Sequence, residues 1–333
     1  MTARTIRRIA LALLVLLATA WLCAAPAASD EQVLFAPHIA IEQPDGSSIV
    51  EIDAWVHQPK PRRLLHWAFA RYLRIDEKAM SDAERALFRQ RTQLFRVDSK
   101  RDRSVDVMLP DGQTRHLPRT GSDGRSRTTV TVRTSDASPW IAFSATLPQN
   151  KAHRFQGRAL RVPQQGWSVV SDIDDTIKQS QVLDRRELLL NTFVRPFHAV
   201  PGMAQRYRDF AEGDADTRFH YVSTSPLQLL PALADFLIEA DFPEGSLHLR
   251  EATRWRALLG DEEATVNHKR HAIDRLLGQF PQRRFILIGD SGEHDPAIYA
   301  DLARRHPDRI ALIAIRRVGD GVDAQHRKAI QRD

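Results

Sequence analysis

Cysteine is nearly absent from this sequence. Its 333 residues include one cysteine, Cys23, which lies in a leader-like segment whose cleavage would leave no thiol. Disulfides and cysteine nucleophiles are therefore excluded from a mature chain. Zinc-ligand spacing, nucleic-acid-binding motifs, internal repeats and low-complexity segments are also lacking. We accordingly interpret His220, His268 and His294 as ordinary polar histidines, and we expect no nucleic-acid partner.

The first 27 residues have the pattern of a secretory signal peptide. Arg4, Arg7 and Arg8 precede an apolar stretch over residues 9–25, and small residues at 25–27 offer a cleavage site. We expect this leader to direct the chain across the inner membrane, which predicts a periplasmic protein. The apolar stretch is slightly short for a spanning helix, and an uncleaved amino-terminal anchor is the alternative.

Composition predicts a soluble, globular protein of two domains. Of its residues 42% are hydrophobic, and the formal net charge is +6. Without the three leader arginines the charge is about +3, which is mildly basic. Such a surface suits peripheral contact with anionic lipid or phosphate-rich partners, while ordinary mixed surface charge is the alternative. The sequence does not indicate any protein partner.

Residues 33–160 are predicted to form a mostly β, sandwich-like domain of unknown role. Apolar and polar residues alternate over 50–57 and 104–109, and residues 128–132 are β-rich. One helix is expected to interrupt the strands, because Ser81 and Glu84 form a capping-box pattern. An arginine-rich turn is interpreted as a solvated loop and contains Arg115, Arg119, Arg125 and Arg127.

A short acidic motif follows an apolar run in the second half of the chain. Asp172 and Asp174 lie two positions apart, directly after residues 167–170, where a buried strand is expected to end. In an extended segment both side chains would share one face, and a turn starting there would point both into one pocket. Alone this motif is weak, because aspartates are common in turns and helix caps.

Three further elements follow the acidic motif. Ser223 ends the apolar strand 219–222, and Lys269 falls near the start of an amphipathic helix. Asp290 and Asp295 follow another short apolar strand. An acid pair, a hydroxyl, a lysine and a second acid pair are the parts needed to bind a metal ion and a phosphoryl group together.

Each of these residues also has a purely structural interpretation. Ser223 is alternatively a strand-end hydroxyl, and Ser225 before Pro226 is most simply a helix N-cap. Lys269 has basic neighbours and would then lie on a solvated helix face. Asp295 would be part of a turn and cap, which would leave one acidic ligand in its loop.

Residues 161–320 are predicted to form an α/β domain with a doubly wound parallel sheet. Strands alternate with helical patterns, which indicates a sheet covered by helices on both faces. The candidate site residues then fall at the carboxyl ends of strands, where open α/β sheets bind ligands. The insertion 179–218 either caps this pocket or packs as a static helix. The expected strands are 167–172, 218–223, 246–250, 284–289 and 309–315.

These motifs resemble the four motifs of the haloacid dehalogenase superfamily of phosphohydrolases. More narrowly, they are similar to the actin-patch phosphatidate phosphatase family over roughly residues 160 to 318, which implies a haloacid dehalogenase-like Rossmannoid fold. Leu227 and Ala297 depart from residues common in that family, which puts substrate preference in doubt more than the reaction. The resemblance rests on residues 170–178, 191–193, 200–203, 221–226 and 288–296.

The resemblance implies a role for each candidate residue. Asp172 would be the nucleophile that forms an aspartyl-phosphate, and Asp174 would be the general acid and then the base. Ser223 would hydrogen-bond a phosphoryl oxygen, and Lys269 would neutralise developing charge. The implied ligands suit Mg²⁺ because all are oxygen atoms. They come from Asp172, the backbone carbonyl of Asp174, Asp290 and Asp295.

The sequence therefore predicts a secreted, Mg²⁺-dependent phosphatase of a phosphomonoester. The resemblance makes the conversion of phosphatidate to diacylglycerol the leading reaction. A phosphatase of soluble or other envelope phosphoesters is one alternative, and a non-catalytic envelope binding protein is another. Cytoskeletal partners are not expected, because they belong to family members that act inside eukaryotic cells.

Overall fold

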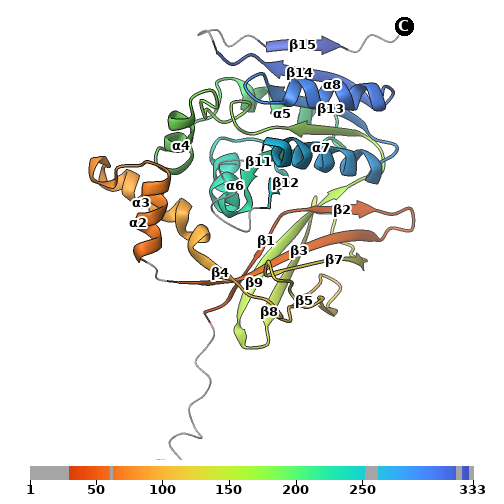
Figure 1. The fold of residues 1–333 in the computed structure, drawn as a ribbon. Coiled ribbons are helices and arrows are strands. Elements are labelled where there is room, and N and C mark those ends of the chain that lie inside the picture. Colours follow the sequence, from red (N-terminus) through yellow and green to blue (C-terminus); the bar gives the residue numbers. More distant parts are fainter. Residues whose placement is uncertain (1–29, 61–62, 252–261, 320–324, 330–333) are drawn as a thin grey trace, which may run out of the picture.

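The computed structural model describes residues 30–60, 63–251, 262–319 and 325–329 (Figure 1). The predicted leader, with Cys23, lies outside these residues. Within the described ranges, no helix combines the length and apolar character needed to cross a membrane. The strands form two sheets, one of nine strands from the first half of the chain and one of six from the second.

The nine-stranded sheet is organised around one long strand, β3. This strand pairs antiparallel with β1, β2, β4 and β7, while β2 pairs parallel with β9. The alternation predicted over 50–57 is confirmed, because Val50 and Ile52 are buried in one apolar core with Val107 and Phe143. Side chains from distant strands of the sheet thus share a core, as a sandwich-like fold requires. The strands are β1 Gln32–Phe35, β2 Ile39–Glu42, β3 Ser48–Pro59, β4 Val97–Ser99, β5 Asp106–Met108, β6 Thr114–His116, β7 Arg125–Val132, β8 Trp140–Leu147 and β9 Asn150–Val162.

Two helices, rather than the single one expected, lie between β3 and β4. They are α2 (Arg63–Tyr72) and α3 (Asp82–Thr92), with 3-10 turns at 77–79 and 93–96. The predicted capping box of α3 is confirmed, since the Ser81 hydroxyl accepts the Glu84 N–H and the Glu84 carboxylate accepts the Ser81 N–H. Both helices lie beside α4 in Figure 1.

The six-stranded sheet has five parallel strands and one antiparallel edge strand. Its order is β12-β11-β10-β13-β14-β15, and only β15 runs antiparallel to its neighbour. The five predicted strands are confirmed to within a few residues, and β10, β13 and β14 are the short apolar runs that burial on both faces favours. The observed strands are β10 Trp167–Ser171, β11 Arg218–Pro226, β12 Gly245–Arg250, β13 Arg284–Asp290, β14 Ile310–Arg316 and β15 Gln325–Ala329.

Helices cover both faces of this sheet. Val169 of β10 packs in an apolar cluster with Tyr207 and Leu233, whereas the next residue, Val170, packs in a second cluster with Leu276 and Leu302. Successive side chains of a strand point to opposite faces, so α5 and α6 cover one face and α7 and α8 cover the other. The helices are α4 Arg185–Phe193, α5 Met203–Gly213, α6 Leu230–Glu239, α7 Glu262–Gln279 and α8 Asp295–Arg305.

The two sheets meet across α7, which lies between β2 and the parallel sheet in Figure 1. Ile39, Trp140 and Leu160 of the β-rich half belong to the same apolar cluster as Ile273 and Leu276 of α7. Strand β9 ends at Val162 and β10 begins at Trp167. The boundary near residue 160 therefore separates the two sheets, although one apolar cluster crosses it, and the division into independent domains stays a prediction.

Candidate active site

The acidic motif forms a tight turn directly after β10. Ile173 and Ile177 are fully buried and anchor the turn in the core, while the Ile173 carbonyl accepts the N–H groups of Ile177 and Lys178. Asp175 has a positive φ of 51°, a conformation that Asp tolerates better than most residues. Its carboxylate accepts three backbone N–H groups, from Ser180, Gln181 and Val182. Asp175 thus holds the loop that follows the turn.

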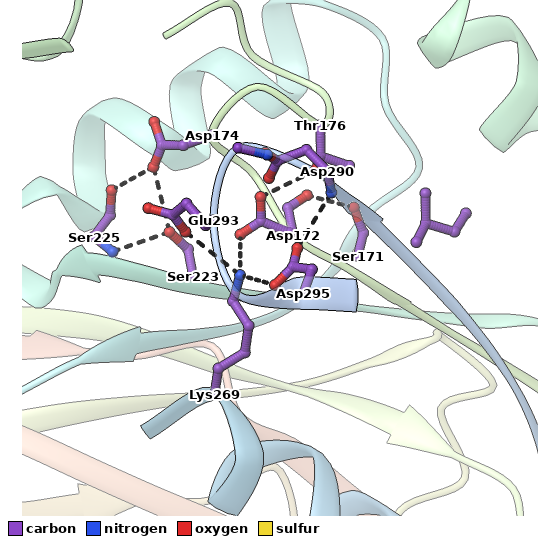
Figure 2. Close-up of polar contacts among 12 residues, drawn as sticks. Ser171, Asp172, Asp174, Thr176, Ser223, Ser225, Lys269, Asp290, Glu293 and Asp295 are labelled. Atoms are coloured by element: carbon purple, nitrogen blue, oxygen red, sulfur yellow. Dashed lines mark hydrogen bonds and ion pairs between the residues drawn. The ribbon is translucent and has the colours of Figure 1, made fainter. Parts of the chain in front are cut away.

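Asp172, Asp290 and Asp295 converge at the carboxyl ends of β10 and β13 (Figure 2). One carboxylate oxygen from each lies within 4.8 Å of the others, and all three residues are buried. The ammonium of Lys269 lies 3.0 Å from Asp172 Oδ1 and 2.5 Å from Asp295 Oδ1. Thr176 donates to Asp172 Oδ2 at 3.0 Å. Predicted site residues from three separate motifs are therefore brought together.

The cluster carries more negative charge than Lys269 balances. Burial raises the pKa of Asp172 well above its ordinary value, and the charges of Asp295 and Asp290 add to this rise although Lys269 opposes it. Burial and Asp295 likewise raise the pKa of Asp290 to about 7. Burial alone would lower the pKa of Lys269, but Asp172 and Asp295 raise it well above its usual range.

One oxygen of the cluster has no hydrogen-bond partner. Asp290 Oδ1 accepts the Gly292 N–H at 2.6 Å, whereas Asp290 Oδ2 is buried without a partner among the described residues. Leaving a buried carboxylate oxygen unpaired costs free energy, so such an atom needs an explanation. A cation among these three carboxylates would supply the missing interaction and the missing positive charge.

The carboxylate of Asp174 has a different set of partners. It lies 2.7 Å from the buried Lys178 ammonium, and it accepts hydrogen bonds from Ser180 Oγ at 2.6 Å and Ser225 Oγ at 2.9 Å. Burial alone would raise the pKa of Asp174, but Lys178 and these hydroxyls hold it below its ordinary value. The side chain is thus fixed on the side of β11 in Figure 2, where Ser223 and Ser225 also lie.

One local expectation, for Lys269, and two structural alternatives, for Ser225 and Asp295, need correction. Ser225 is not a helix N-cap, because β11 continues through Pro226 and α6 begins only at Leu230. Lys269 is not near the start of its helix, since α7 begins at Glu262. The side chain of Asp295 faces the carboxylate cluster rather than acting only as a cap, although the residue is the first of α8.

Sequence reasoning gave no role to three polar residues of the site, although all lie inside the quoted motifs or next to them. Lys178 follows Asp174 by four residues and closes the same turn, in which Asp174 and Lys178 form a β-bridge that local sequence does not reveal. Ser180 bridges Lys178 and Asp174. Glu293 lies 3.7 Å from the Lys269 ammonium, and its pKa is raised chiefly by burial, with a contribution from the charge of Asp174.

Comparison with known families agrees with this geometry. Residues 167–317 match the family model described as the catalytic domain of phosphatidate phosphatase APP1. Over these residues the chain is similar to the actin-patch phosphatidate phosphatase family. The match begins at β10 and ends just after β14, so it covers all the site residues named above. The narrower resemblance seen in the sequence is confirmed, whereas the haloacid dehalogenase superfamily stays a prediction.

Two yeast proteins are similar to part of this chain. The chain is 36% identical over 159 residues to phosphatidate phosphatase APP1 of Saccharomyces cerevisiae, which covers 45% of this chain and 26% of the relative. It is 34% identical over 157 residues to an uncharacterized protein of Schizosaccharomyces pombe, over 46% of this chain and 25% of that one. The chain thus spans about a quarter of the length of these relatives.

One solved structure aligns with most of the chain at low similarity. A carbohydrate esterase aligns over 85% of this chain and 88% of its own, at 10% identity and a TM-score of 0.24. Similarity at that level does not bear on fold or function.

Proposed function

We propose that this chain is a Mg²⁺-dependent phosphatase that hydrolyses phosphatidate to diacylglycerol through an aspartyl-phosphate on Asp172. The observation that carries the proposal is the convergence of Asp172, Asp290 and Asp295 within 4.8 Å around Lys269. The S. cerevisiae relative is a phosphatidate phosphatase, which suggests the substrate. The parallel sheet with ligand residues at its carboxyl edge supports a haloacid dehalogenase-like architecture.

The residues present fit a magnesium ion. Every candidate ligand is an oxygen, as Mg²⁺ prefers, and the unpaired Asp290 Oδ2 lacks a partner that a cation would provide. The side chain of Asp174 is held by Lys178 and Ser180, so only its backbone carbonyl remains as a ligand from that residue. When bound, Mg²⁺ would offset the repulsion among the carboxylates and the phosphate.

The reaction would proceed in two displacements at phosphorus. An oxygen of Asp172 attacks the phosphorus, the phosphorus–oxygen ester bond breaks, and the leaving alkoxide takes a proton from Asp174. Water then attacks the aspartyl-phosphate, gives its proton to Asp174, and releases inorganic phosphate and the free Asp172 carboxylate. Lys269 neutralises charge on the transferring group. The Ser223 hydroxyl accepts the Ser225 N–H at 3.0 Å and makes a long 3.5 Å contact with Asp174, so its proton would be available to a phosphoryl oxygen.

These roles require an ionised Asp172 and a protonated Asp174, and a bound cation and substrate would favour these two states. Asp172 must be ionised to attack, and a divalent cation beside it would lower the raised pKa. Asp174 must carry a proton, and the negative charge of an arriving phosphate would raise its lowered pKa. The Ser225 hydroxyl can rotate to accept a hydrogen bond from the protonated acid.

Phosphate release from several substrates tests the proposal. Phosphatidate, lysophosphatidate and sugar phosphates are compared with Mg²⁺ and with EDTA, for the wild-type chain and for Asp172→Asn. Mg²⁺-dependent release that is fastest from phosphatidate and abolished in Asp172→Asn is expected. Faster release from sugar phosphates would overturn the lipid assignment, and no release from any ester would favour a binding protein.

The location of the protein is proposed from the leader pattern at residues 4–27. We expect the mature protein in the periplasm, where phosphatidate would be reached from the membrane surface. Fractionation of the producing cell tests this proposal. Recovery of the protein with the integral membrane fraction would instead support the uncleaved anchor.

A further inference from the structure

A basic groove lies between the end of α2 and the start of α4. Its volume is about 610 Å³, and its lining residues come from both segments. Arg74, Arg185 and Arg186 are exposed to solvent. Figure 1 shows α2 and α4 on the side of the molecule away from α8. The residues that line the groove are Tyr72, Leu73, Arg74, Arg185, Arg186 and Leu189.

The positive charge of this groove is not balanced within the part of the chain that the structure describes. None of Arg74, Arg185 and Arg186 forms an ion pair there, in contrast to Arg195, which pairs with Glu187 at 2.5 Å. The nearest acid along the chain, Asp184, uses its carboxylate to accept backbone N–H groups at the start of α4. The arginine side chains are therefore available to an anionic partner.

An exposed leucine, Leu183, lies two residues before Arg185 of the groove. The side chain of Leu183 is 63% exposed. Among the large hydrophobic residues that the structure describes, only Ile238 is comparably exposed. It immediately precedes Asp184, the N-cap of α4. Arginines beside an exposed leucine are the combination that binds the interface of an anionic bilayer, through charge and shallow insertion of the apolar side chain.

The same segment is tied to the catalytic turn. The Asn191 side chain in α4 donates to the Ser180 carbonyl at 3.1 Å, and Ser180 Oγ donates to Asp174 Oδ1 at 2.6 Å. Val182 and Leu183 pack beside Gly292, two residues after Asp290. A bilayer bound at the groove would thus lie at the mouth of the site rather than on a remote face.

We propose that the groove lined by Arg74, Arg185 and Arg186, together with Leu183, docks the protein onto the surface of an anionic lipid bilayer. Docking presents a phosphorylated headgroup to the catalytic site while its acyl chains stay in the membrane. The inference rests on the proposed function for the identity of the substrate. The binding itself is independent of catalysis, because charge and insertion act on any anionic bilayer.

Vesicle sedimentation with a lipid that is not a substrate tests the docking. The full chain is mixed with phosphatidylcholine vesicles and with vesicles that contain roughly a third phosphatidylglycerol. We expect binding to the anionic vesicles alone, and at least about 20-fold weaker binding for Arg185→Glu/Arg186→Glu, since each basic residue near such a surface contributes about fivefold. Acidic residues suit the first turn of a helix, so this variant should still fold.

A matched control separates docking from overall charge. Arg101→Glu/Lys151→Glu makes the same charge change at two exposed positions of the β-rich half and should bind anionic vesicles like wild type. Leu183→Ser, which keeps the charge, should weaken binding as well. Equal binding to both vesicle types, or equal loss in the control and the Arg185/Arg186 variant, would overturn the docking surface.

A second readout distinguishes a failure of docking from a failure of the proposed function. The ratio of turnover of bilayer phosphatidate to turnover of a short-chain, water-soluble phosphatidate is measured for each variant. This ratio should fall at least about 20-fold in Arg185→Glu/Arg186→Glu, in proportion to binding. An unchanged ratio would contradict docking. Vesicle binding without hydrolysis of either ester would leave docking supported and the phosphatase function wrong.

Discussion

Two aspartates that are two positions apart have opposite electrostatic environments in this site. Burial, assisted by the neighbouring carboxylates, raises the pKa of Asp172, whereas Lys178 and two hydroxyls hold the pKa of Asp174 below its ordinary value. The tight turn after β10 creates this difference, because it directs one side chain toward β13 and the other toward β11. Pairs of groups with opposed environments are typical of acid–base catalysis.

Asp290→Asn tests whether the Asp290 carboxylate is a ligand of the proposed cation. The remaining amide oxygen can still accept the Gly292 N–H, but the residue loses its charge. Affinity for Mg²⁺ in calorimetric titration should fall at least about tenfold, the loss seen even for residues that only support a metal ligand. The melting temperature in EDTA should not fall, because charge repulsion with Asp295 is removed.

The control for this change is Asp235→Asn, at an exposed carboxylate on α6. It should leave both the affinity for Mg²⁺ and the melting temperature in EDTA unaltered. Wild-type affinity for Mg²⁺ in Asp290→Asn would remove that residue from the ligand set.

Lys178→Met tests the buried ion pair with Asp174. Both residues are at least 94% buried, so loss of the ammonium would leave a carboxylate with hydroxyl partners alone. The free energy of unfolding in urea should fall by about 3–5 kcal/mol. The double variant Asp174→Asn/Lys178→Met should recover much of this loss, because it leaves no unpaired charge. Equal stability of Lys178→Met and wild type would show that the pair does not stabilise the turn.

The sequence predicts the residue types of the site better than their contacts. The positions of Asp172, Asp290 and Asp295 after apolar strands followed from pattern, since parallel strands bring their carboxyl ends to one edge. Side-chain direction after a strand end depends on turn geometry, which pattern does not fix. For that reason Ser225 was interpreted as a cap, although its hydroxyl donates to Asp174.

At the scale of elements, β10, β11 and β12 share a chain of buried polar groups. His220 on β11 lies between Ser168 Oγ, at 3.2 Å, and Ser246 Oγ, at 2.8 Å. The Ser246 hydroxyl also lies 2.9 Å from His248 Nε2. Burial, assisted by the charges of Arg283 and Arg218, lowers the pKa of His220 to about 3. The interpretation of His220 as an ordinary polar histidine fits this environment.

This histidine predicts a pH dependence of stability. Between the ordinary value of 6.5 and the folded value of about 3, the unfolded chain binds more protons than the folded one. The contribution of His220 is therefore complete above pH 6.5 and is lost as the pH falls below it. At pH 5 the free energy of unfolding should be about 2 kcal/mol lower because of this histidine. Urea unfolding at pH 7.5 and pH 5 measures it.

Two histidine substitutions, one at a buried and one at an exposed position, test the source of this pH dependence. In His220→Gln, the decrease in the free energy of unfolding between pH 7.5 and pH 5 should be about 2 kcal/mol smaller than in wild type. His271→Gln, at an exposed position of α7, should retain the full decline. An identical decline in wild type and His220→Gln would mean that this histidine does not titrate with unfolding.

Element boundaries were less predictable than element identity. Apolar runs located the five parallel strands, but nothing in the local pattern marked the start of α7 at Glu262, so Lys269 was placed too early in its helix. Helix α2 was not expected at all. Strand pairing in the β-rich sheet was likewise not predictable, since the parallel pairing of β2 with β9 joins segments more than a hundred residues apart in the chain.

On the scale of the whole molecule, the two sheets form a shared interior along α7. Apolar residues of both halves pack in one cluster, and polar contacts border it. Arg127 donates to Glu251 at 2.6 Å, and Trp140 Nε1 donates to Glu244 at 2.6 Å. Arg125, which was expected in a solvated turn, is instead buried in an ion pair with Asp53. Long-range partners of this kind are not visible in local sequence.

Leu276→Ala tests whether the two halves unfold together. Leu276 is fully buried in the cluster that also contains Ile39 and Trp140. Its truncation should cost about 2–5 kcal/mol. If the cluster couples the halves, tryptophan fluorescence and far-ultraviolet circular dichroism should report one coincident unfolding transition at a lower urea concentration. Two separated transitions would show that the halves are independent domains.

The central claim is that Asp172 becomes phosphorylated during turnover. Asp174→Asn removes the base for hydrolysis of the intermediate, whereas an aryl phosphate, whose leaving group needs no proton, can still form it. Acid quenching after addition of an aryl ester labelled in its phosphate should therefore leave label on this variant when Mg²⁺ is present. Mass spectrometry of the peptide that contains residue 172 locates the phosphoryl group. We predict label on Asp172 in Asp174→Asn and none in Asp172→Asn/Asp174→Asn. Label on another residue, or wild-type phosphate release from Asp172→Asn, would contradict the account.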